Sequence, residues 1–238
     1  MKSIYLLVVT GLMHICMSSC SSSETDDSLV ISIMEDVTEK DYKTRPHSQT
    51  IINDLHLTDN PWRSVTFRYT TVSELDYNRQ EEVSLIQENR LVGNSYLRKK
   101  KIKEYTSDIS SIIEQTRTPV EQSQSAIFLP IIRELRQLAQ MSANTKELYV
   151  FSDLKENDSE WFSFYRSSNL QSLKNYPDEV VELFLAQIPE GASFDNVSLH
   201  IIYEPLNADD NQEFRLMVKL YQNIFDSLNV PLSFSANM

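Results

Sequence analysis

Cysteine and glycine are scarce in this sequence, and no internal repeat is evident. Its 238 residues include two cysteines, Cys16 and Cys20, both near the start. Beyond residue 20 no thiol remains, which excludes a disulfide framework and any cysteine-based metal site in the rest of the chain. Three glycines and eight prolines are too few for a low-complexity block or a long linker. The part after residue 27 is long enough for one domain with a substantial core.

The signatures of common enzymes are also missing. The four histidines are His14, His47, His56 and His200, and none has metal-ligand spacing with another histidine or acid. The chain has no glycine-rich phosphate loop and no Gly-x-Ser-x-Gly motif around a nucleophilic serine. His200 alternates within a strand pattern, which is typical of a packed or edge residue. We therefore predict that the chain is not an enzyme.

Positive charge is outweighed by negative charge. The formal net charge is −12, which argues against nucleic acid as a partner. One basic run, Arg98 to Lys101 with Lys103, breaks the trend. Apolar residues at three- and four-residue spacing around it (Ile102, Tyr105, Ile109, Ile112 and Ile113) predict a helix with this run on its solvent face. Contact with anionic lipid or polysaccharide is the alternative interpretation.

The first twenty residues carry export signals. Lys2 precedes an apolar run, Ile4 to Ile15, that is short for a membrane span. Met17-Ser18-Ser19-Cys20 resembles the lipobox of bacterial lipoproteins of the Bacteroidetes type. The resemblance implies a signal peptide at 1–19, acylation of Cys20, a flexible acidic tether at 20–27, and membrane attachment in the bacterial envelope, at the outer membrane. An ordinary secretory signal with an incidental Cys20 is the alternative.

Strand and helix patterns alternate after residue 28. We expect strands at 29–34, 64–72, 82–87, 147–152, 197–203 and near the end of the chain, and helices at 41–58, up to 115, and around the apolar stripes that start near 127, 177 and 214. The eight-residue connection after Val72 suits a hairpin. The fold class is therefore α/β: a doubly wound, mostly parallel six-stranded sheet with one antiparallel edge strand and helices on both faces.

This order of elements resembles the von Willebrand factor type A fold over residues 28–238. In that family a metal-ion-dependent adhesion site forms at the ends of the first and fourth strands. The motif Asp-x-Ser-x-Ser matches Asp36 and Thr38, the later aspartate matches Asp153, and the middle hydroxyl matches Ser125, with Ser123 and Thr118 as competitors. The resemblance implies Mg²⁺ held by these oxygen atoms, with one position left for a partner's carboxylate.

The resemblance fails at Lys40, which stands where the second hydroxyl belongs. A protonated lysine does not ligate Mg²⁺, but it could replace the ion between the two carboxylates. A third interpretation makes Asp36 and Asp153 helix N-caps. Trp161 and Tyr165 follow Asp153 and are candidate contacts for a partner.

We expect a lipid-anchored protein whose type A-like domain binds a protein partner. A purely structural component of an envelope or conjugation apparatus is the alternative function. A phosphohydrolase of the haloacid dehalogenase type fits less well, because Thr38 stands where its second aspartate would be.

Overall fold

The structure is a computed structural model that describes residues 27–38, 42–72, 79–115 and 125–238. The predicted signal peptide, Cys20, Lys40, Thr118 and Ser123 lie outside the described residues, so the expectations about them stay predictions. No helix within the described ranges is both long and apolar enough to cross a bilayer.

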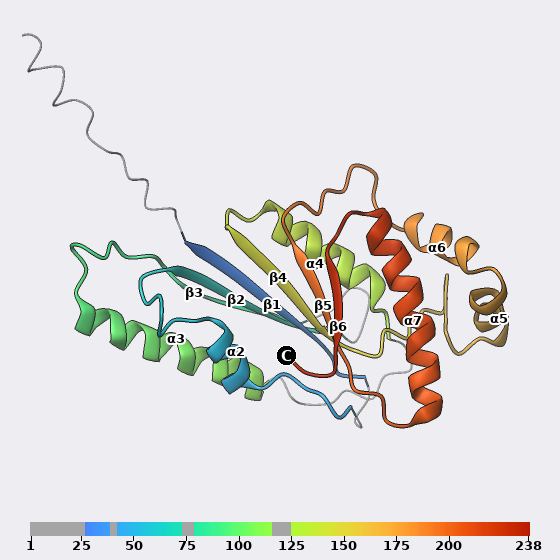
Figure 1. Cartoon of the computed structure of the whole chain (residues 1–238), viewed down its shortest axis with the longest axis horizontal. Helices are drawn as coiled ribbons and strands as arrows, with labels where there is room; N and C mark the ends of the chain where they lie inside the picture. Colours follow the sequence, from blue (N-terminus) through green and yellow to red (C-terminus); the bar gives the residue numbers. More distant parts are fainter. Residues whose placement is uncertain (1–26, 39–41, 73–78, 116–124) are drawn as a thin grey trace, which may run out of the picture.

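A six-stranded sheet forms the centre of the molecule (Figure 1). Its spatial order is β3-β2-β1-β4-β5-β6, in which β3 runs antiparallel to β2 and every other neighbouring pair is parallel. The strands are β1 (Ser28–Asp36), β2 (Ser64–Val72), β3 (Gln80–Leu85), β4 (Thr145–Phe151), β5 (Ser198–Ile202) and β6 (Leu232–Ser235). The predicted mostly parallel sheet with an antiparallel edge strand is confirmed. The near-continuous burial along β1 is typical of an interior strand covered on both faces.

The helices lie on the two faces of this sheet (Figure 1). They are α2 (Ser48–Asp54), α3 (Ser95–Gln115), α4 (Phe128–Gln140), α5 (Ser167–Asn175), α6 (Pro177–Leu185) and α7 (Ala208–Ser227). One core contains side chains of α4 to α7, and the other contains side chains of α2 and α3. The predicted helix at 41–58 is shorter than expected. Pro46 disfavours helical backbone in the residue before it, and His56 with φ 49° lies beyond the end of α2.

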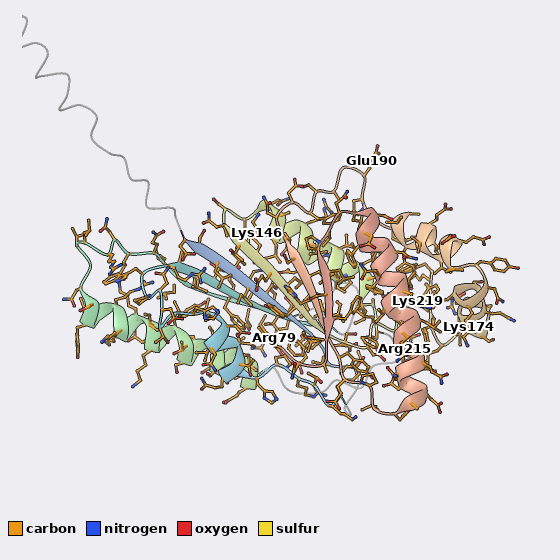
Figure 2. All side chains as sticks on the ribbon, in the orientation of Figure 1. Arg79, Lys146, Lys174, Glu190, Arg215 and Lys219 are labelled. Carbon is orange, nitrogen blue, oxygen red and sulfur yellow. The ribbon has the colours of Figure 1, made fainter. Side chains whose placement is uncertain are left out.

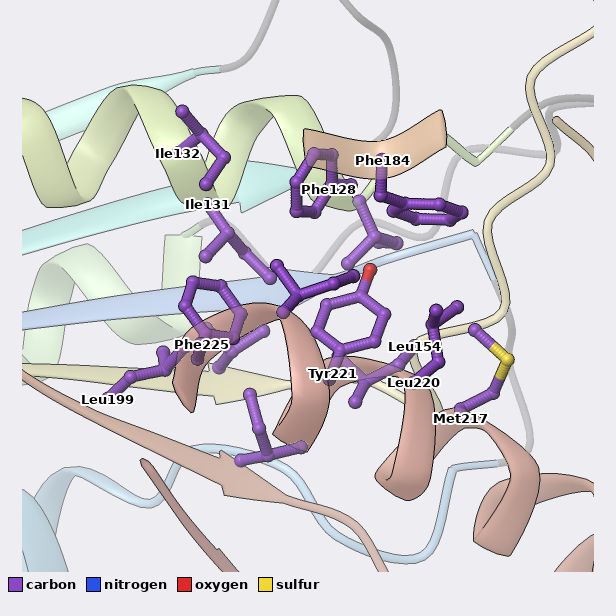
Figure 3. Close-up of a cluster of buried hydrophobic side chains, with 14 of the residues drawn as sticks. Phe128, Ile131, Ile132, Leu154, Phe184, Leu199, Met217, Leu220, Tyr221 and Phe225 are labelled. Carbon is purple, nitrogen blue, oxygen red and sulfur yellow. The ribbon is translucent and has the colours of Figure 1, made fainter. Parts of the chain in front are cut away.

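The larger core lies between the sheet and α4 and α7 (Figure 3). Phe128 of α4 contacts Phe184 of α6 and Tyr221 of α7 with edge-on rings, at centroid distances of 4.9 and 6.1 Å. Ring pairs of this geometry stabilise a core beyond the area that they bury. Arg215 and Lys219 project from the opposite, outer side of α7 (Figure 2). The apolar face of α7 therefore packs against the sheet near the ends of β4 and β5.

The basic run of α3 differs from its prediction at one residue. Arg98 was expected on the solvent face, yet it is 1% exposed. Its guanidinium donates to three backbone carbonyls, those of Pro61, Arg63 and Ile86. The cause is helical spacing: Arg98 falls on the same stripe as the buried Tyr105 and Ile109. Five donors on a planar group allow arginine to satisfy several carbonyls at once, which makes its burial tolerable.

Candidate functional site

The site lies at the carboxyl ends of β1 and β4. These strands are parallel neighbours, with Glu35 opposite Phe151. The chain leaves β1 toward α2 on one face and leaves β4 toward α5 and α6 on the other. A crevice opens where neighbouring strands of a doubly wound sheet connect in opposite directions, and ligands bind at such points. Asp36 ends β1, and Asp153 stands two residues beyond β4.

Asp36 is 2% exposed and surrounded by donors. Its Oδ1 accepts from the backbone N–H and the hydroxyl of Thr38, at 3.0 and 2.6 Å. Its Oδ2 accepts from the hydroxyls of Tyr42, Ser125 and Ser152, at 3.2, 3.3 and 3.1 Å. Burial raises the pKa of Asp36, and the hydrogen bonds from Thr38 oppose that rise. The carboxyl is thus held by four hydroxyl groups from three segments of the chain: the connection after β1, the residue Ser125 before α4, and the end of β4.

Asp153 is paired with a lysine. The Nζ of Lys155 lies 3.3 Å from Asp153 Oδ2 and 2.9 Å from both Asp210 Oδ1 and Glu213 Oε2. Burial opposes the charge of Lys155, but the charge of Asp153 and the hydrogen bonds to Glu213 and Asp210 outweigh it and raise the lysine pKa. Lys155 therefore carries its positive charge at neutral pH and compensates these acids.

Asp210 extends this network to β5 and α7. Its Oδ2 accepts from the hydroxyl of Tyr203 at 2.7 Å and from the backbone N–H of Leu206 at 2.8 Å. Burial acts to raise the pKa of Asp210, but these hydrogen bonds and Lys155 outweigh it and lower that pKa. Asp210 lies in the first turn of α7, where Asn207 caps the helix. The ion pair of Lys155 thus ties the end of β4 to the start of α7.

A further buried acid lies behind Asp36. Glu156 is 0% exposed, and its Oε2 accepts from the backbone N–H groups of Ile127 and Phe128 at 2.9 and 2.8 Å, at the start of α4. Its Oε1 has no hydrogen-bond partner among the described residues. Burial raises the pKa of Glu156 to about 8, and the charges of Asp158 and Asp36 add to that rise. Glu156 is therefore largely protonated at neutral pH.

The structure brings together part of the predicted metal set. Asp36, Thr38 and Ser125 are in direct contact, whereas Asp153 makes its ion pair with Lys155. The N-cap interpretation is wrong, because α2 is preceded by His47 and α5 by Arg166. Sequence reasoning missed Tyr42, Ser152, Lys155, Asp210 and Glu156. Ser152 and Lys155 flank Asp153 in the segment "FSDLK" and were open to inspection, but only the fold places Asp210 beside them.

The chemistry of the donor set does not fit the four-ligand magnesium site. Asp36 offers one carboxylate with hydroxyls, and the second carboxylate of that set, Asp153, is neutralised by Lys155. Within the ranges that the structure describes, no three His, Cys, Asp or Glu side chains are placed to hold a metal ion.

The segment after Asp153 folds back beside Ser125. Isolated β-bridges join Ser125 to Asn157 and Asn157 to Ser163, so this segment lies beside the Asp36 cluster. Trp161 is half-buried and packs edge-on against Phe184, at a centroid distance of 4.6 Å. Tyr165 is 59% exposed. Of the two predicted contact residues, Tyr165 presents its ring to solvent, while Trp161 supports the core.

Comparison with known proteins adds one structural likeness. No family model matches the chain, and no curated protein matches it. Among solved structures, the pilus adhesin SpaC from Lactobacillus rhamnosus GG, in its open conformation, is similar with 12% sequence identity and a TM-score of 0.39. The match covers 90% of this chain and 28% of that chain, so this chain spans less than a third of the adhesin. At this identity and TM-score the likeness assigns no function.

Proposed function

We propose that this chain is a lipid-anchored envelope protein whose type A-like domain binds a protein partner at the carboxyl edge of its sheet. The observation that carries the proposal is the Asp36 cluster, in which four hydroxyls from three segments converge on one carboxyl at the junction of β1 and β4. The exposed ring of Tyr165, in the segment that follows Asp153, offers the kind of contact that is enriched in protein interfaces.

The order of strands supports the resemblance to the type A fold. The antiparallel edge strand β3 and the central pair β1 and β4 match the arrangement that the resemblance implies. Cys20 supplies the anchor in this proposal through the lipobox-like segment before it.

We further propose that binding at this edge does not use Mg²⁺. The ammonium of Lys155 compensates Asp153 and Asp210, so an added cation would have to displace a buried ion pair.

The metal question is tested by titrating Mg²⁺ and Mn²⁺ into the protein and following its thermal unfolding. We expect no rise in Tm at millimolar ion beyond that of an Asp36→Asn variant. A rise in Tm that saturates with ion concentration and is absent from Asp36→Asn would restore the magnesium site.

The binding proposal is tested by placing a photo-crosslinking residue at position 165 in envelopes of the native bacterium. The control carries the same residue at position 176, because Tyr176 is 58% exposed but stands at the end of α5, eleven residues further along the chain than Tyr165. We expect a discrete adduct from position 165 and none from 176. Adducts of equal yield at both positions, or at neither, would favour the structural role without a dedicated site.

A further inference from the structure

Exposed apolar side chains gather at the end of the molecule opposite to the Asp36 cluster. Five side chains between β3 and the first turn of α3 form what we term the end patch: Ile86 (78% exposed), Leu91 (87%), Val92 (85%), Tyr96 (77%) and Leu97 (50%). The remaining large apolar side chains that are exposed in the described ranges, Tyr165, Tyr176, Leu183 and Leu206, lie far from it in sequence. Such a concentration marks an interaction surface.

The end patch lies where β1 begins. Ser28 pairs with Ser64 at the start of β2, and Leu85 at the end of β3 pairs with Val65. Ile86 and Ser28 also line the same surface hollow. Figure 1 shows the connection from β3 to α3 at the same end of the sheet as the start of β1. A chain that enters the domain at Ser28 therefore enters beside the end patch.

Two contacts hold this surface in place. Arg98 donates to the carbonyl of Ile86 at 2.6 Å and to that of Arg63 at 2.7 Å. Gly93 approaches Trp62 so closely that an added Cβ would meet the indole ring at 2.3 Å. The patch is thus fixed on the rigid sheet, and its docking orders few additional side chains.

The charge around the end patch differs from that of the whole chain. Arg90, Lys99 and Lys103 are exposed, and none of the three forms an ion pair with another described residue. Lys100 and Lys101 pair with Glu104 and Glu88 on the surface. Basic and apolar side chains side by side, with a tyrosine, are typical of segments that lie in the interface of an anionic bilayer.

We propose that the end patch docks onto the surface of the lipid bilayer in which Cys20 is anchored. This inference rests on the proposed acylation of Cys20. Only residues 21–27 separate Cys20 from Ser28. Even fully extended, this stretch reaches about 30 Å at most. The anchor therefore keeps the start of β1 and the adjoining end patch close to the bilayer, and insertion of Leu91 and Val92 adds a second point of attachment.

Trp62 reports this docking, because it packs against Gly93 in the connection from β3 to α3. The acylated chain with Trp161→Phe, which leaves Trp62 as the sole tryptophan, is reconstituted on phosphatidylcholine vesicles containing brominated lipid, with and without phosphatidylglycerol. We expect the fluorescence of Trp62 to be quenched at least twofold, and more strongly with phosphatidylglycerol. In the reciprocal chain with Trp62→Phe, Trp161 stays unquenched.

Matched variants assign the quenching to the end patch. Leu91→Ser with Val92→Ser should abolish most of it, whereas Tyr176→Ser with Leu183→Ser, which removes the same kind of exposed side chains elsewhere, should leave it unchanged. Lys99→Glu with Lys103→Glu should remove the added effect of phosphatidylglycerol, and Lys174→Glu with Lys219→Glu, two exposed lysines of α5 and α7 (Figure 2), should not.

The outcomes separate the patch from the anchor. An acylated chain that stays on vesicles with Trp62 unquenched overturns the docking and leaves the anchor intact. If mass spectrometry of the mature protein shows no lipid on Cys20, the anchor is overturned. The end patch is then tested with the unacylated chain on phosphatidylglycerol vesicles, and absence of Trp62 quenching there overturns the docking as well. The protein could instead form a dimer in the absence of vesicles. If the double substitution Leu91→Ser with Val92→Ser dissociates that dimer, the patch binds a second copy of the chain.

Discussion

Lys155 compensates three acids, and its removal is expected to weaken the fold. In Lys155→Met the largely buried Asp153 and Asp210 lose their shared cation, while Glu213 is partly exposed and can be hydrated. We expect a loss of about 3 kcal/mol at pH 7 in urea unfolding. Lys174→Met, at an exposed lysine, should change stability by less than about 0.5 kcal/mol.

The pH dependence gives this prediction its sign. In the wild-type chain the pKa of Asp210 is lowered, so its contribution is present above the unfolded pKa and is lost as the pH falls through the folded value. Without Lys155 the acids are easier to protonate, and the variant regains relative stability as the pH falls. The difference between the two proteins should therefore be smaller at pH 4 than at pH 7, and a constant difference would contradict the ion-pair account.

Glu156 is expected to change stability with pH in the opposite direction to Asp210. Its folded pKa is raised to about 8 from an ordinary 4.5, so the wild-type fold loses stability as the pH rises through that window. Glu156→Gln keeps an oxygen for the N–H groups of Ile127 and Phe128 and cannot ionise. We expect the variant to gain stability over the wild type between pH 5 and 8, by about 1.4 kcal/mol for each rise of one pH unit, and to match it near pH 4. Glu190→Gln, at an exposed acid, is the control, and parallel Tm curves of Glu156→Gln and wild type would contradict the assignment.

At the scale of elements, Arg98 ties the start of α3 to the start of β2 and the end of β3. Arg98→Met would leave the carbonyls of Pro61, Arg63 and Ile86 without their donor. Each buried polar group left unpaired is unfavourable by about 1–3 kcal/mol, so we expect a total loss of several kcal/mol in urea unfolding. Arg98→Lys supplies one ammonium group, so its free energy of unfolding should fall between those of the wild type and Arg98→Met. Lys99→Met, its exposed neighbour, should have little effect, and equal effects at 98 and 99 would refute the tie.

The elements themselves were largely predictable, and the contacts between distant ones were not. Period-two alternation placed β2 at 64–72, and the short connection after it predicted the antiparallel hairpin with β3. Parallel pairing of β1 with β4 brings Asp36 beside Ser152, and Ser125 before α4 also donates to Asp36, as the resemblance implied. The partner of Asp153 escaped prediction because Lys155 also needs Asp210, which lies 55 residues further along the chain in α7. Arg98 looked like one charge among several, although its spacing from Tyr105 and Ile109 placed it on the buried stripe.

At the scale of the whole molecule, the two surfaces lie at opposite ends of the sheet. The end patch adjoins the start of β1, and the Asp36 cluster lies at the end of this strand of nine residues. At about 3.3 Å per residue the strand separates them by about 30 Å. Docking of the end patch on the bilayer would therefore point the Asp36 cluster and Tyr165 away from the lipid, toward a partner.

This orientation is measurable with spin labels, because residues 28–238 contain no cysteine of their own. Single substitutions Leu91→Cys and Tyr165→Cys, each in the chain acylated on Cys20, carry one nitroxide each at exposed positions. On phosphatidylglycerol-containing vesicles we expect the label at 91 to be shielded from a water-soluble relaxation agent and exposed to a lipid-soluble one. The label at 165 should be exposed to the water-soluble agent and shielded from the lipid-soluble one. In the unacylated Cys20→Ser chain without vesicles, both labels should be exposed to the water-soluble agent. If the label at position 165 is instead shielded from the water-soluble agent on vesicles, the carboxyl edge of the sheet lies on the lipid. That result would contradict the proposed orientation.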